Sequence, residues 1–285
     1  MCRRDGRHGR NPRGVSVCRG SAVVASLTFV DLFARPRGFV LYICIPAYNE
    51  AQTVGVLLWR IRKVFQEYSR EYEILVYDDG SSDATQETLR PYTDVLPLTV
   101  LGGREHLGYD RALDALARAV SARTRYPRRD AMITLQADFT DQPEHLPELI
   151  KRFEGGADLV VAERTVTPAT PTPVRRMRWI ASWAMRASGP VPGVVDPFGA
   201  LRLYRIALIR DLLKESGDGP IVRGDGWAAN LHLLRRAMPL ARRLETVALD
   251  ARYDVRARES RLRPWSDGLK LFRAGRAPRP RKAES

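Results

Sequence analysis

The strongest constraint on the fold is a short apolar run that leads directly into a polar turn. Residues Val40 to Ile45 are apolar and end at a proline, which is typical of a central strand. The turn 46–50 (PAYNE) follows, and we expect Asn49 to cap a helix that begins near Glu50. Apolar side chains then recur at helical spacing, at Val54, Leu57, Leu58, Ile61 and Val64. A strand that runs into a helix N-terminus is where α/β folds place a nucleotide.

The same alternation of strand and helix continues along the chain. After the strand 39–45 and the helix 51–69, we predict further strands at 73–78, 96–101, 131–136, 157–162, 196–204 and 245–253. The helices between them are predicted from about 84, and at 109–122, 144–154, 175–187, 205–215 and 227–237. Strands that alternate with helices favour right-handed crossovers. The sequence therefore predicts an α/β fold, a single domain with a mostly parallel central sheet flanked by helices.

The positive charge of the chain is concentrated at its two ends. The net charge is +14, yet residues 1–38 carry eight Arg against two acids and residues 251–285 carry eleven Lys and Arg against four acids. We therefore divide the chain into a basic, poorly ordered extension (1–38), a domain (39–256) and a basic tail (257–285). Such ends are solvated arms, or they contact an anionic membrane surface or nucleic acid. Of these partners, nucleic acid is the least favoured.

Cysteine content and hydrophobicity bear on the location of the protein. The three cysteines form no CxxC pair, which fits a reducing compartment. No apolar run reaches about 18 residues, so no transmembrane helix is predicted. The stretch 21–34 is similar to a secretion signal, but Asp31 interrupts it, and we interpret it as part of an N-terminal extension. We expect a cytoplasmic protein, with a peripheral position on the cytoplasmic membrane face as the alternative.

Acidic residues follow three of the predicted strands. The carboxyl ends of parallel strands line one crevice, so Glu50, Asp79 and Asp138 should converge there. A single acid after a strand is usually a helix cap, but three in one sheet favour a shared site. Asp138 is the best candidate ligand for Mg²⁺ or Mn²⁺. Asp141 is either a second ligand or a cap for the helix that begins near residue 144.

Three sequence motifs resemble those of a known family. IPAYNE (45–50), VYDDGSSDAT (76–85) and LQADFTDQPE (135–144) occur in the order and spacing of family 2 glycosyltransferases of the GT-A fold. The nearest resemblance is to the branch that transfers sugars to polyprenyl or dolichyl phosphate, and it covers about 39–210. It implies a Rossmann-like GT-A domain and inverting hexosyl transfer from a nucleotide-diphospho-sugar. A polyprenyl phosphate is the acceptor that it suggests.

The resemblance also implies roles for individual residues of the first half. Asp138 matches the last acid of the family's Asp-x-Asp, which binds the metal on the sugar diphosphate, and it is therefore expected to be catalytic. Gln136 stands where the family has the first Asp of that motif. The residues implied to hold the nucleotide are Pro46, Ala47, Tyr48, Glu50 and Asp79.

At the acceptor end the match is weaker. Asp196 and Arg202 match the outer residues of the family's Asp-x-x-Ser-Gly-Phe-Arg, although an ordinary strand with a bend is the alternative. Asp225 lies where inverting members with a hydroxyl acceptor place a general base, or else it caps the helix 227–237. A basic segment resembles one that meets the acceptor phosphate or the diphosphate, or else is a solvated tail: Arg256, Arg258 and Arg261.

Two other classes of function remain open from the sequence. The loss of the first Asp at Gln136 also fits a non-catalytic protein that binds nucleotide-sugars. The basic ends alone would fit nucleic-acid binding. The glycines at 102, 103 and 108 do not have the spacing of a dinucleotide-binding loop, and His106 between them is interpreted as a loop residue rather than a ligand.

Overall fold

The structure, a computed structural model of the 285-residue chain, describes residues 38–165 and 191–250. It also describes five residues between these ranges: Thr170, Thr172, Arg175, Arg176 and Trp179. The chain divides into two compact units between Arg37 and Gly38. Every element given below belongs to the unit that begins at Gly38.

Seven strands of the described part form one sheet in the order β3-β2-β1-β4-β6-β5-β7. Their pairings are parallel except those of β6, which runs antiparallel to both of its neighbours, β4 and β5. The predicted mostly parallel sheet is therefore confirmed. The strands are β1 (Val40–Ala47), β2 (Glu71–Asp79), β3 (Leu98–Gly103), β4 (Ala131–Thr134), β5 (Leu159–Thr165), β6 (Arg202–Arg205) and β7 (Leu244–Asp250).

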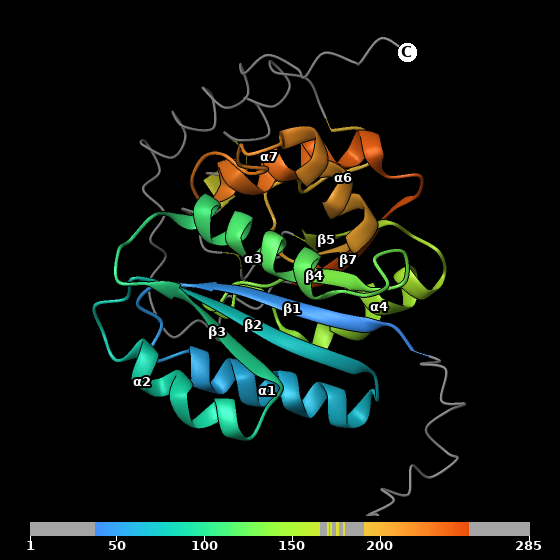
Figure 1. The fold of residues 1–285 in the computed structure, drawn as a ribbon. Helices are drawn as coiled ribbons and strands as arrows, with labels where there is room; N and C mark the ends of the chain where they lie inside the picture. The colour runs from blue at the N-terminus through green and yellow to red at the C-terminus, as the bar shows by residue number, and fades with distance from the viewer. Residues whose placement is uncertain are drawn as a thin grey trace, which may run out of the picture. The chain divides into compact units, whose positions relative to one another are not determined.

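Helices cover both faces of this sheet (Figure 1). One face carries α1 and α4, with the short α2 beside α1, and the other carries α3, α6 and α7. The α-helices are α1 (Val54–Glu67), α2 (Thr85–Leu89), α3 (Tyr109–Arg123), α4 (Leu146–Glu154), α6 (Ile206–Ser216) and α7 (Trp227–Ala237). The described residues also form three short 3₁₀ helices, η1 (Arg90–Asp94), η2 (Pro143–His145) and η3 (Met238–Leu240).

Burial on both faces explains why the central strands are apolar without interruption. In β1, Leu41, Ile43 and Ile45 pack toward α1, whereas Tyr42 and Cys44 pack toward α3. Side chains alternate between the two faces of a strand, and a parallel sheet covered on both sides buries them all. The apolar run that predicted the first strand is therefore a direct consequence of its central position.

Some predicted boundaries are wrong. Helix α1 begins at Val54 rather than near Glu50, because Asn49 has a left-handed backbone (φ 53°) and does not cap it. Strand β6 begins at Arg202 rather than at 196, and the residues before it form turns. Most of the predicted helix 175–187, and the predicted strand beyond residue 250, lie outside the described residues.

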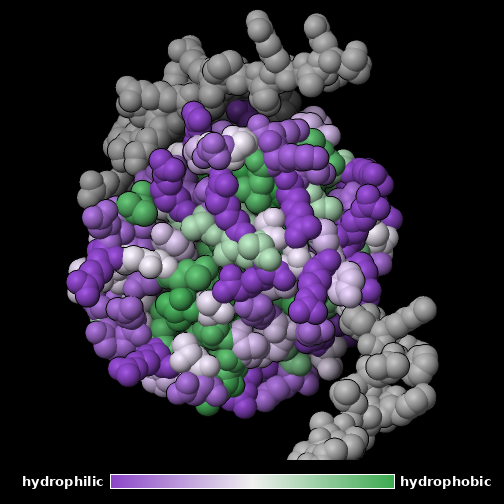
Figure 2. Space-filling view, in the orientation of Figure 1, coloured by the Kyte–Doolittle hydropathy of each residue, from purple (hydrophilic) through white to green (hydrophobic). Residues whose placement is uncertain are grey.

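One face of the described part is largely polar. Figure 2 shows one face on which hydrophilic side chains dominate and hydrophobic ones gather in small patches. Among the described residues, no helix combines the length and the hydrophobicity needed to cross a bilayer.

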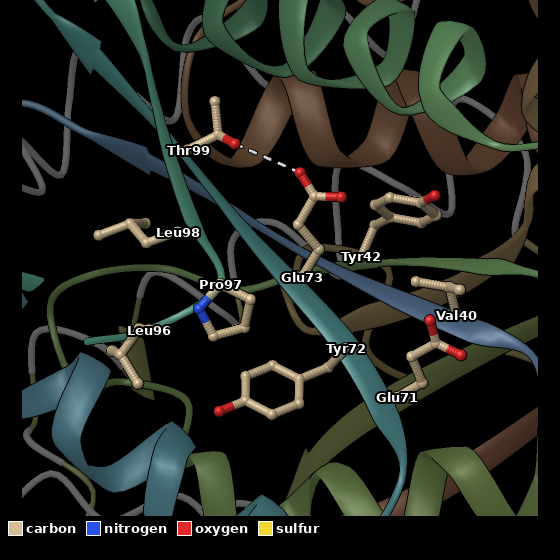
Figure 3. A pocket seen from close by; sticks show the side chains of 9 residues that line it. All are labelled: Val40, Tyr42, Glu71, Tyr72, Glu73, Leu96, Pro97, Leu98 and Thr99. Carbon is tan, nitrogen blue, oxygen red and sulfur yellow. Dashed lines mark hydrogen bonds between the residues drawn. The ribbon is translucent and has the colours of Figure 1, made fainter. Parts of the chain in front are cut away.

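A pocket lies at the amino ends of β1 and β2, beside the segment 96–99 that leads into β3 (Figure 3). Its lining is acidic and aromatic, and the carboxylate of Glu73 accepts hydrogen bonds from Thr99 and Arg123. None of the predicted site residues line it. The pocket therefore lies away from the carboxyl edge of the sheet, where the loops of the three sequence motifs follow their strands.

Candidate functional site

Three motif loops meet at the carboxyl edge of the sheet. Strands β2, β1 and β4 are parallel neighbours, and the loops 46–53, 78–85 and 135–144 follow them. Ala47 pairs with Asp78 at the ends of β1 and β2. The predicted placement of Glu50, Asp79 and Asp138 at one edge of the sheet is therefore confirmed.

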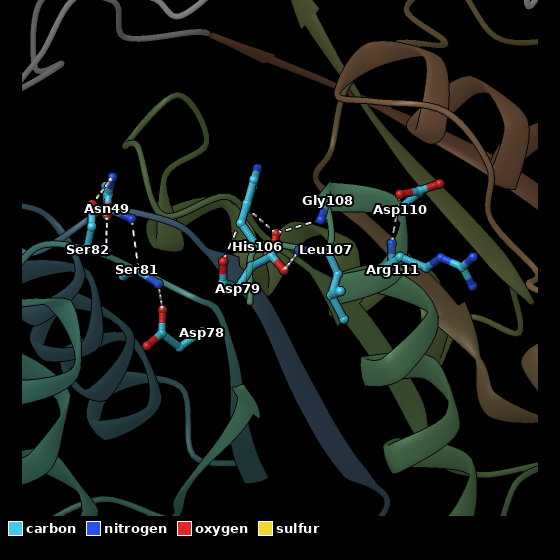
Figure 4. Close-up of polar contacts among 10 residues, drawn as sticks. All are labelled: Asn49, Asp78, Asp79, Ser81, Ser82, His106, Leu107, Gly108, Asp110 and Arg111. Atoms are coloured by element: carbon cyan, nitrogen blue, oxygen red, sulfur yellow. Dashed lines mark hydrogen bonds and ion pairs between the residues drawn. The ribbon is translucent and has the colours of Figure 1, made fainter. Parts of the chain in front are cut away.

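Asn49 joins the first of these loops to the second. Its backbone N–H donates to Ser81 Oγ (2.9 Å), and its side-chain Oδ1 accepts from the backbone N–H of Ser82 (2.7 Å) (Figure 4). The backbone N–H of Glu50 donates to Thr85 Oγ1 (2.9 Å). The two loops thus form one hydrogen-bonded unit. Asparagine suits this position because it tolerates the left-handed conformation better than most residues.

The Glu50 carboxylate supports the start of α1. Its side chain is buried, and Oε2 accepts a hydrogen bond from the hydroxyl of Thr53 (2.8 Å). The backbone oxygen of Glu50 accepts from the N–H groups of Thr53 and Val54. Glu50 therefore holds the first turn of the helix in place beside the edge of the sheet.

Asp79 binds the loop between β3 and α3, residues 104–108. One carboxylate oxygen accepts from the N–H of Leu107 (2.8 Å) and the other from the N–H of Gly108 (2.9 Å) (Figure 4). His106 Nδ1 lies 2.8 Å from Asp79 Oδ2. The carboxylate is almost fully buried by these contacts. Asp79 therefore fixes this loop. Asp78 holds its own turn by accepting from the N–H of Ser81 (3.2 Å).

His106 and Tyr48 form a stacked aromatic pair at this edge. Their ring centroids are 3.9 Å apart, with an angle of 22° between the planes. The His106 side chain stays about half exposed (51%), so part of the pair faces solvent. The sequence indicates only a loop residue at His106, because no local pattern shows that it lies against a residue of the first motif.

Two glycines allow the 104–108 loop to lie against the second motif. Gly102 has φ 124°, and a Cβ there would lie 1.9 Å from the backbone oxygen of Asp78. Gly80 has φ 68°, and a Cβ there would lie 2.6 Å from the backbone carbon of Glu105. Both the conformation and the close backbone approach exclude larger side chains. These glycines serve the contact between Asp79 and the loop rather than a dinucleotide-binding motif.

We expect Asp79→Asn to loosen the 104–108 loop. An amide group can accept with its oxygen only, so one of the N–H groups of Leu107 and Gly108 loses its acceptor. The lost bond is one between an N–H group and a charged carboxylate, which contributes about 1.5–3 kcal/mol to stability. Urea unfolding should show a loss of that size, and hydrogen exchange should be faster at Leu107 and Gly108. Asp94→Asn, at an exposed position of η1, is the matched control, and equal effects of the two substitutions would contradict this role of Asp79.

Asp138 lies partly exposed in the turn after β4. Its Oδ1 accepts from the N–H of Thr140 (3.0 Å), and Phe139 between them has a left-handed backbone (φ 59°). The described residues contain no cluster of three or more His, Cys, Asp or Glu suited to a metal ion. A partly exposed carboxylate at the sheet edge fits Mg²⁺ or Mn²⁺ when the other ligands are substrate phosphates and water.

Asp141 is neither an exposed second ligand nor a helix cap. Its carboxylate is buried and paired with the Arg164 guanidinium through two hydrogen bonds (2.9 and 2.8 Å). Burial raises the pKa of the Asp141 carboxyl; Arg164 opposes that shift, whereas the charges of Asp138 and Asp196 add to it. Helix α4 begins at Leu146 without a side-chain cap. The expected roles for Asp141 are therefore wrong, because a residue 23 positions later occupies its carboxylate.

Arg202 does not face an acceptor. Its side chain is 1% exposed, and its guanidinium donates to the backbone oxygens of Pro197 (2.6 Å) and Asn230. The expectation of a phosphate-binding arginine at this position is therefore wrong for this structure. Asp196, also buried, accepts from the N–H of Phe198 (3.3 Å) and helps to shape the same segment.

Asp225 is exposed, between two glycines with positive φ. The N-cap of α7 is Gly226, and no side chain caps this helix, so the alternative of Asp225 as the cap is wrong. Its role as a general base stays a prediction. Arg256, Arg258 and Arg261 lie outside the described residues.

The chain is similar to a known protein family and to curated members of related enzymes. The family described as "Glycosyl transferase family 2" matches residues 42–213. The undecaprenyl-phosphate 4-deoxy-4-formamido-L-arabinose transferase of Serratia proteamaculans is 32% identical over 174 residues, which are 60% of this chain and 50% of that protein. The prophage bactoprenol glucosyl transferase homolog of Escherichia coli is 28% identical over 172 residues, 59% of this chain and 53% of that protein. The chain spans about half the length of these curated relatives.

Solved structures show the same fold at low sequence identity. Glucosyl-3-phosphoglycerate synthase from Mycobacterium tuberculosis, in complex with phosphoglyceric acid, matches with a TM-score of 0.56 and 18% identity over 87% of this chain and 81% of that one. The same enzyme with Mn²⁺, uridine diphosphate and phosphoglyceric acid matches with a TM-score of 0.57 and 17% identity over 84% and 76%. The predicted GT-A fold is confirmed.

Proposed function

The chain belongs to glycosyl transferase family 2, and on that premise we propose that it transfers a hexosyl group from a nucleotide-diphospho-sugar to an acceptor, with inversion at the anomeric carbon. The observation that carries the proposal is the meeting of three motif loops at one sheet edge, where Asn49 and Asp79 tie neighbouring loops together. In open α/β sheets this edge is where ligands bind.

The nucleotide would bind at the first two loops. The Tyr48–His106 pair offers a partly exposed aromatic surface, and stacking on such a surface stabilises a base by about 1–3 kcal/mol. Asp79 acts there by holding His106 and the 104–108 loop in place. Pro46, Ala47 and Glu50 form the neighbouring wall, with Glu50 fixing the start of α1.

Asp138 would hold Mg²⁺ or Mn²⁺ together with the diphosphate of the donor. A bound divalent cation would offset the negative charge that develops on the leaving diphosphate. The bond from the N–H of Thr140 orients the Asp138 carboxylate, and Arg164 pairs with the neighbouring Asp141. Gln136 adds no charge of its own at this point.

The acceptor that we propose is a polyprenyl phosphate. Its support comes from the curated relatives, which are named for undecaprenyl phosphate and bactoprenol. A phosphate oxygen is already a nucleophile at neutral pH, so such an acceptor needs no general base, whereas a hydroxyl acceptor would need Asp225 in that role. Contacts of Arg256, Arg258 and Arg261 with phosphate, and of the basic ends with an anionic cytoplasmic membrane face, belong to the same proposal.

A product screen tests the proposal. The full chain is incubated with UDP-, GDP- and dTDP-hexoses, with undecaprenyl phosphate or 3-phosphoglycerate as acceptor, and products are identified by mass. We expect a glycosyl phosphopolyprenol that forms with Mn²⁺ or Mg²⁺ and disappears when EDTA removes the metal.

Other outcomes separate the alternatives. Transfer to 3-phosphoglycerate alone would contradict the proposed lipid acceptor but would still support glycosyltransferase activity. Calorimetry that shows sugar-nucleotide binding without metal dependence, together with no product, would instead identify a non-catalytic binding protein. Salt-sensitive DNA binding that vanishes when 1–38 and 257–285 are deleted would assign that activity to the basic ends alone.

A further inference from the structure

An arginine of α1 contacts the turn that carries Asp138 at three points. Arg60 donates from Nε to Oε1 of Glu144 (2.9 Å) and from Nη2 to Oε2 of the same carboxylate (2.6 Å). Its Nη2 also donates to Oε1 of Gln142 (3.1 Å), and its guanidinium carbon lies 5.6 Å from the centroid of the Phe139 ring. One side chain of α1 therefore holds three residues of the third motif.

This turn has a conformation that costs free energy. Phe139 has a left-handed backbone (φ 59°), which costs about 1–3 kcal/mol in a residue other than glycine. Thr140 Oγ1 and Gln142 Nε2 are buried, and within the described part of the chain neither atom makes a hydrogen bond. A buried polar group without a partner costs about 1–3 kcal/mol. Because such a turn persists only where its surroundings fix it, the position of Asp138 depends on contacts from outside the turn.

Arg60 supplies contacts of this kind. Its side chain is largely buried (17% exposed), and its planar group bonds both oxygens of one carboxylate, a fixed geometry that lysine cannot reproduce. The Phe139 ring that it covers packs into the core between α1 and the sheet, whereas the neighbouring Asp138 stays partly exposed at the sheet edge. Arg60 thus holds the buried side of the turn whose other side presents the Asp138 carboxylate.

We propose that Arg60 is a positioning residue for the metal site, which holds residues 139–144 in place so that the Asp138 carboxylate meets the cation on the donor diphosphate. That a cation binds there rests on the proposed function, whereas the contacts of Arg60 with the turn do not. Residues that orient a metal ligand typically change metal affinity 10–100-fold when they are substituted. A purely structural ion pair near the surface would instead contribute about 0–1 kcal/mol to stability and leave metal affinity unchanged.

Binding of Mn²⁺ in the presence of UDP, with GDP and dTDP in parallel, tests the proposal without any sugar transfer. Free Mn²⁺ is measured by electron paramagnetic resonance during titration of the full chain. We expect Arg60→Met to raise the Kd for Mn²⁺ about tenfold or more. Arg60→Lys keeps the charge but loses the paired bonds, and it should raise the Kd about threefold. The lysine variant decides the question if Arg60→Met does not fold, because an unchanged Kd in a folded Arg60→Lys would overturn the proposal.

A second arginine of similar surroundings provides the matched control. Arg70 donates from Nε to Oε1 of Glu154 (2.7 Å) and lies over the Tyr68 ring (4.4 Å to the centroid), next to the amino end of β2 rather than the edge that carries the motifs. Arg70→Met should leave the Kd for Mn²⁺ within about twofold of the wild type. Equal rises in Arg60→Met and Arg70→Met would indicate general loosening and overturn the proposal.

Hydrogen exchange gives a readout that needs no metal. The amide of Thr140, which donates to Asp138 Oδ1, should exchange about fivefold faster or more in Arg60→Met and at the wild-type rate in Arg70→Met. Wild-type exchange and a wild-type Kd in Arg60→Met would show that other contacts suffice to hold the turn, and would overturn the proposal. If the wild type binds no Mn²⁺ with any of the nucleotides, the proposed metal role of Asp138 fails, while exchange at Thr140 still decides whether Arg60 holds the turn.

Discussion

Asp138→Ala is expected to lower turnover by about 100-fold or more while the domain stays folded. The substitution removes the carboxylate that we assign to the cation on the donor diphosphate, and with it the stabilisation of charge on the leaving group. The structural loss is expected to be small, because the carboxylate is partly exposed and its bond from the N–H of Thr140 lies within a turn. That bond contributes about 1 kcal/mol to stability.

The measurement is kcat for sugar transfer at saturating Mn²⁺, with circular dichroism and thermal unfolding on the same samples. Asp218→Ala is the matched control, since Asp218 is exposed in the turn after α6, far along the chain from the motifs. Near wild-type turnover in Asp138→Ala would exclude Asp138 as the metal ligand. A variant that has lost its circular dichroism spectrum would instead show that the turn after β4 is essential for folding.

Arg202→Met is expected to lower the free energy of unfolding by about 2–5 kcal/mol. Methionine can fill the buried space, but it leaves the backbone oxygens of Pro197 and Asn230 without their donors. Each buried acceptor that loses its partner costs about 1–3 kcal/mol. Urea unfolding, read by tryptophan fluorescence, measures the change as a lower midpoint at a similar slope.

The same variant separates a structural role from an acceptor-binding role. Arg242→Met, at an exposed arginine before β7, is the control and should leave stability within about 0.5 kcal/mol of the wild type. If Arg202→Met were as stable as that control but had lost its affinity for the acceptor phosphate, the interpretation of Arg202 as a phosphate ligand would be restored.

Much of the fold could be predicted from short-range patterns. The apolar run in β1, the helical spacing in α1 and the acids after the strands are all local signals, and they located the sheet and the edge that carries the motifs. The boundaries of α1 and β6 could not be predicted in this way. By its residue type and position Asn49 predicts a helix cap, but its backbone is left-handed. The residues before Arg202 have the composition of a strand, but they form turns.

The residues of the candidate site could be predicted from the sequence, but their partners could not. Asp79, Asp138 and Glu50 were identified because each follows a strand, and a parallel sheet brings strand ends together wherever the helices lie. The partners of those residues were not identified. Asp79 binds a loop 28 positions later, and His106 of that loop stacks on Tyr48.

The sequence by itself determined the family, the mostly parallel sheet and the edge at which its three motifs meet, because these follow from periodicity and from motif residues close together in the chain. Only the tertiary structure decided which polar side chains face solvent and which are used internally. It placed Arg164 on Asp141, buried Arg202 between backbone oxygens, and put the Tyr109 hydroxyl on Asn230. The sequence does not show whether a polar residue lies in a binding site or in the core. Only tertiary packing determines which groups its side chain contacts.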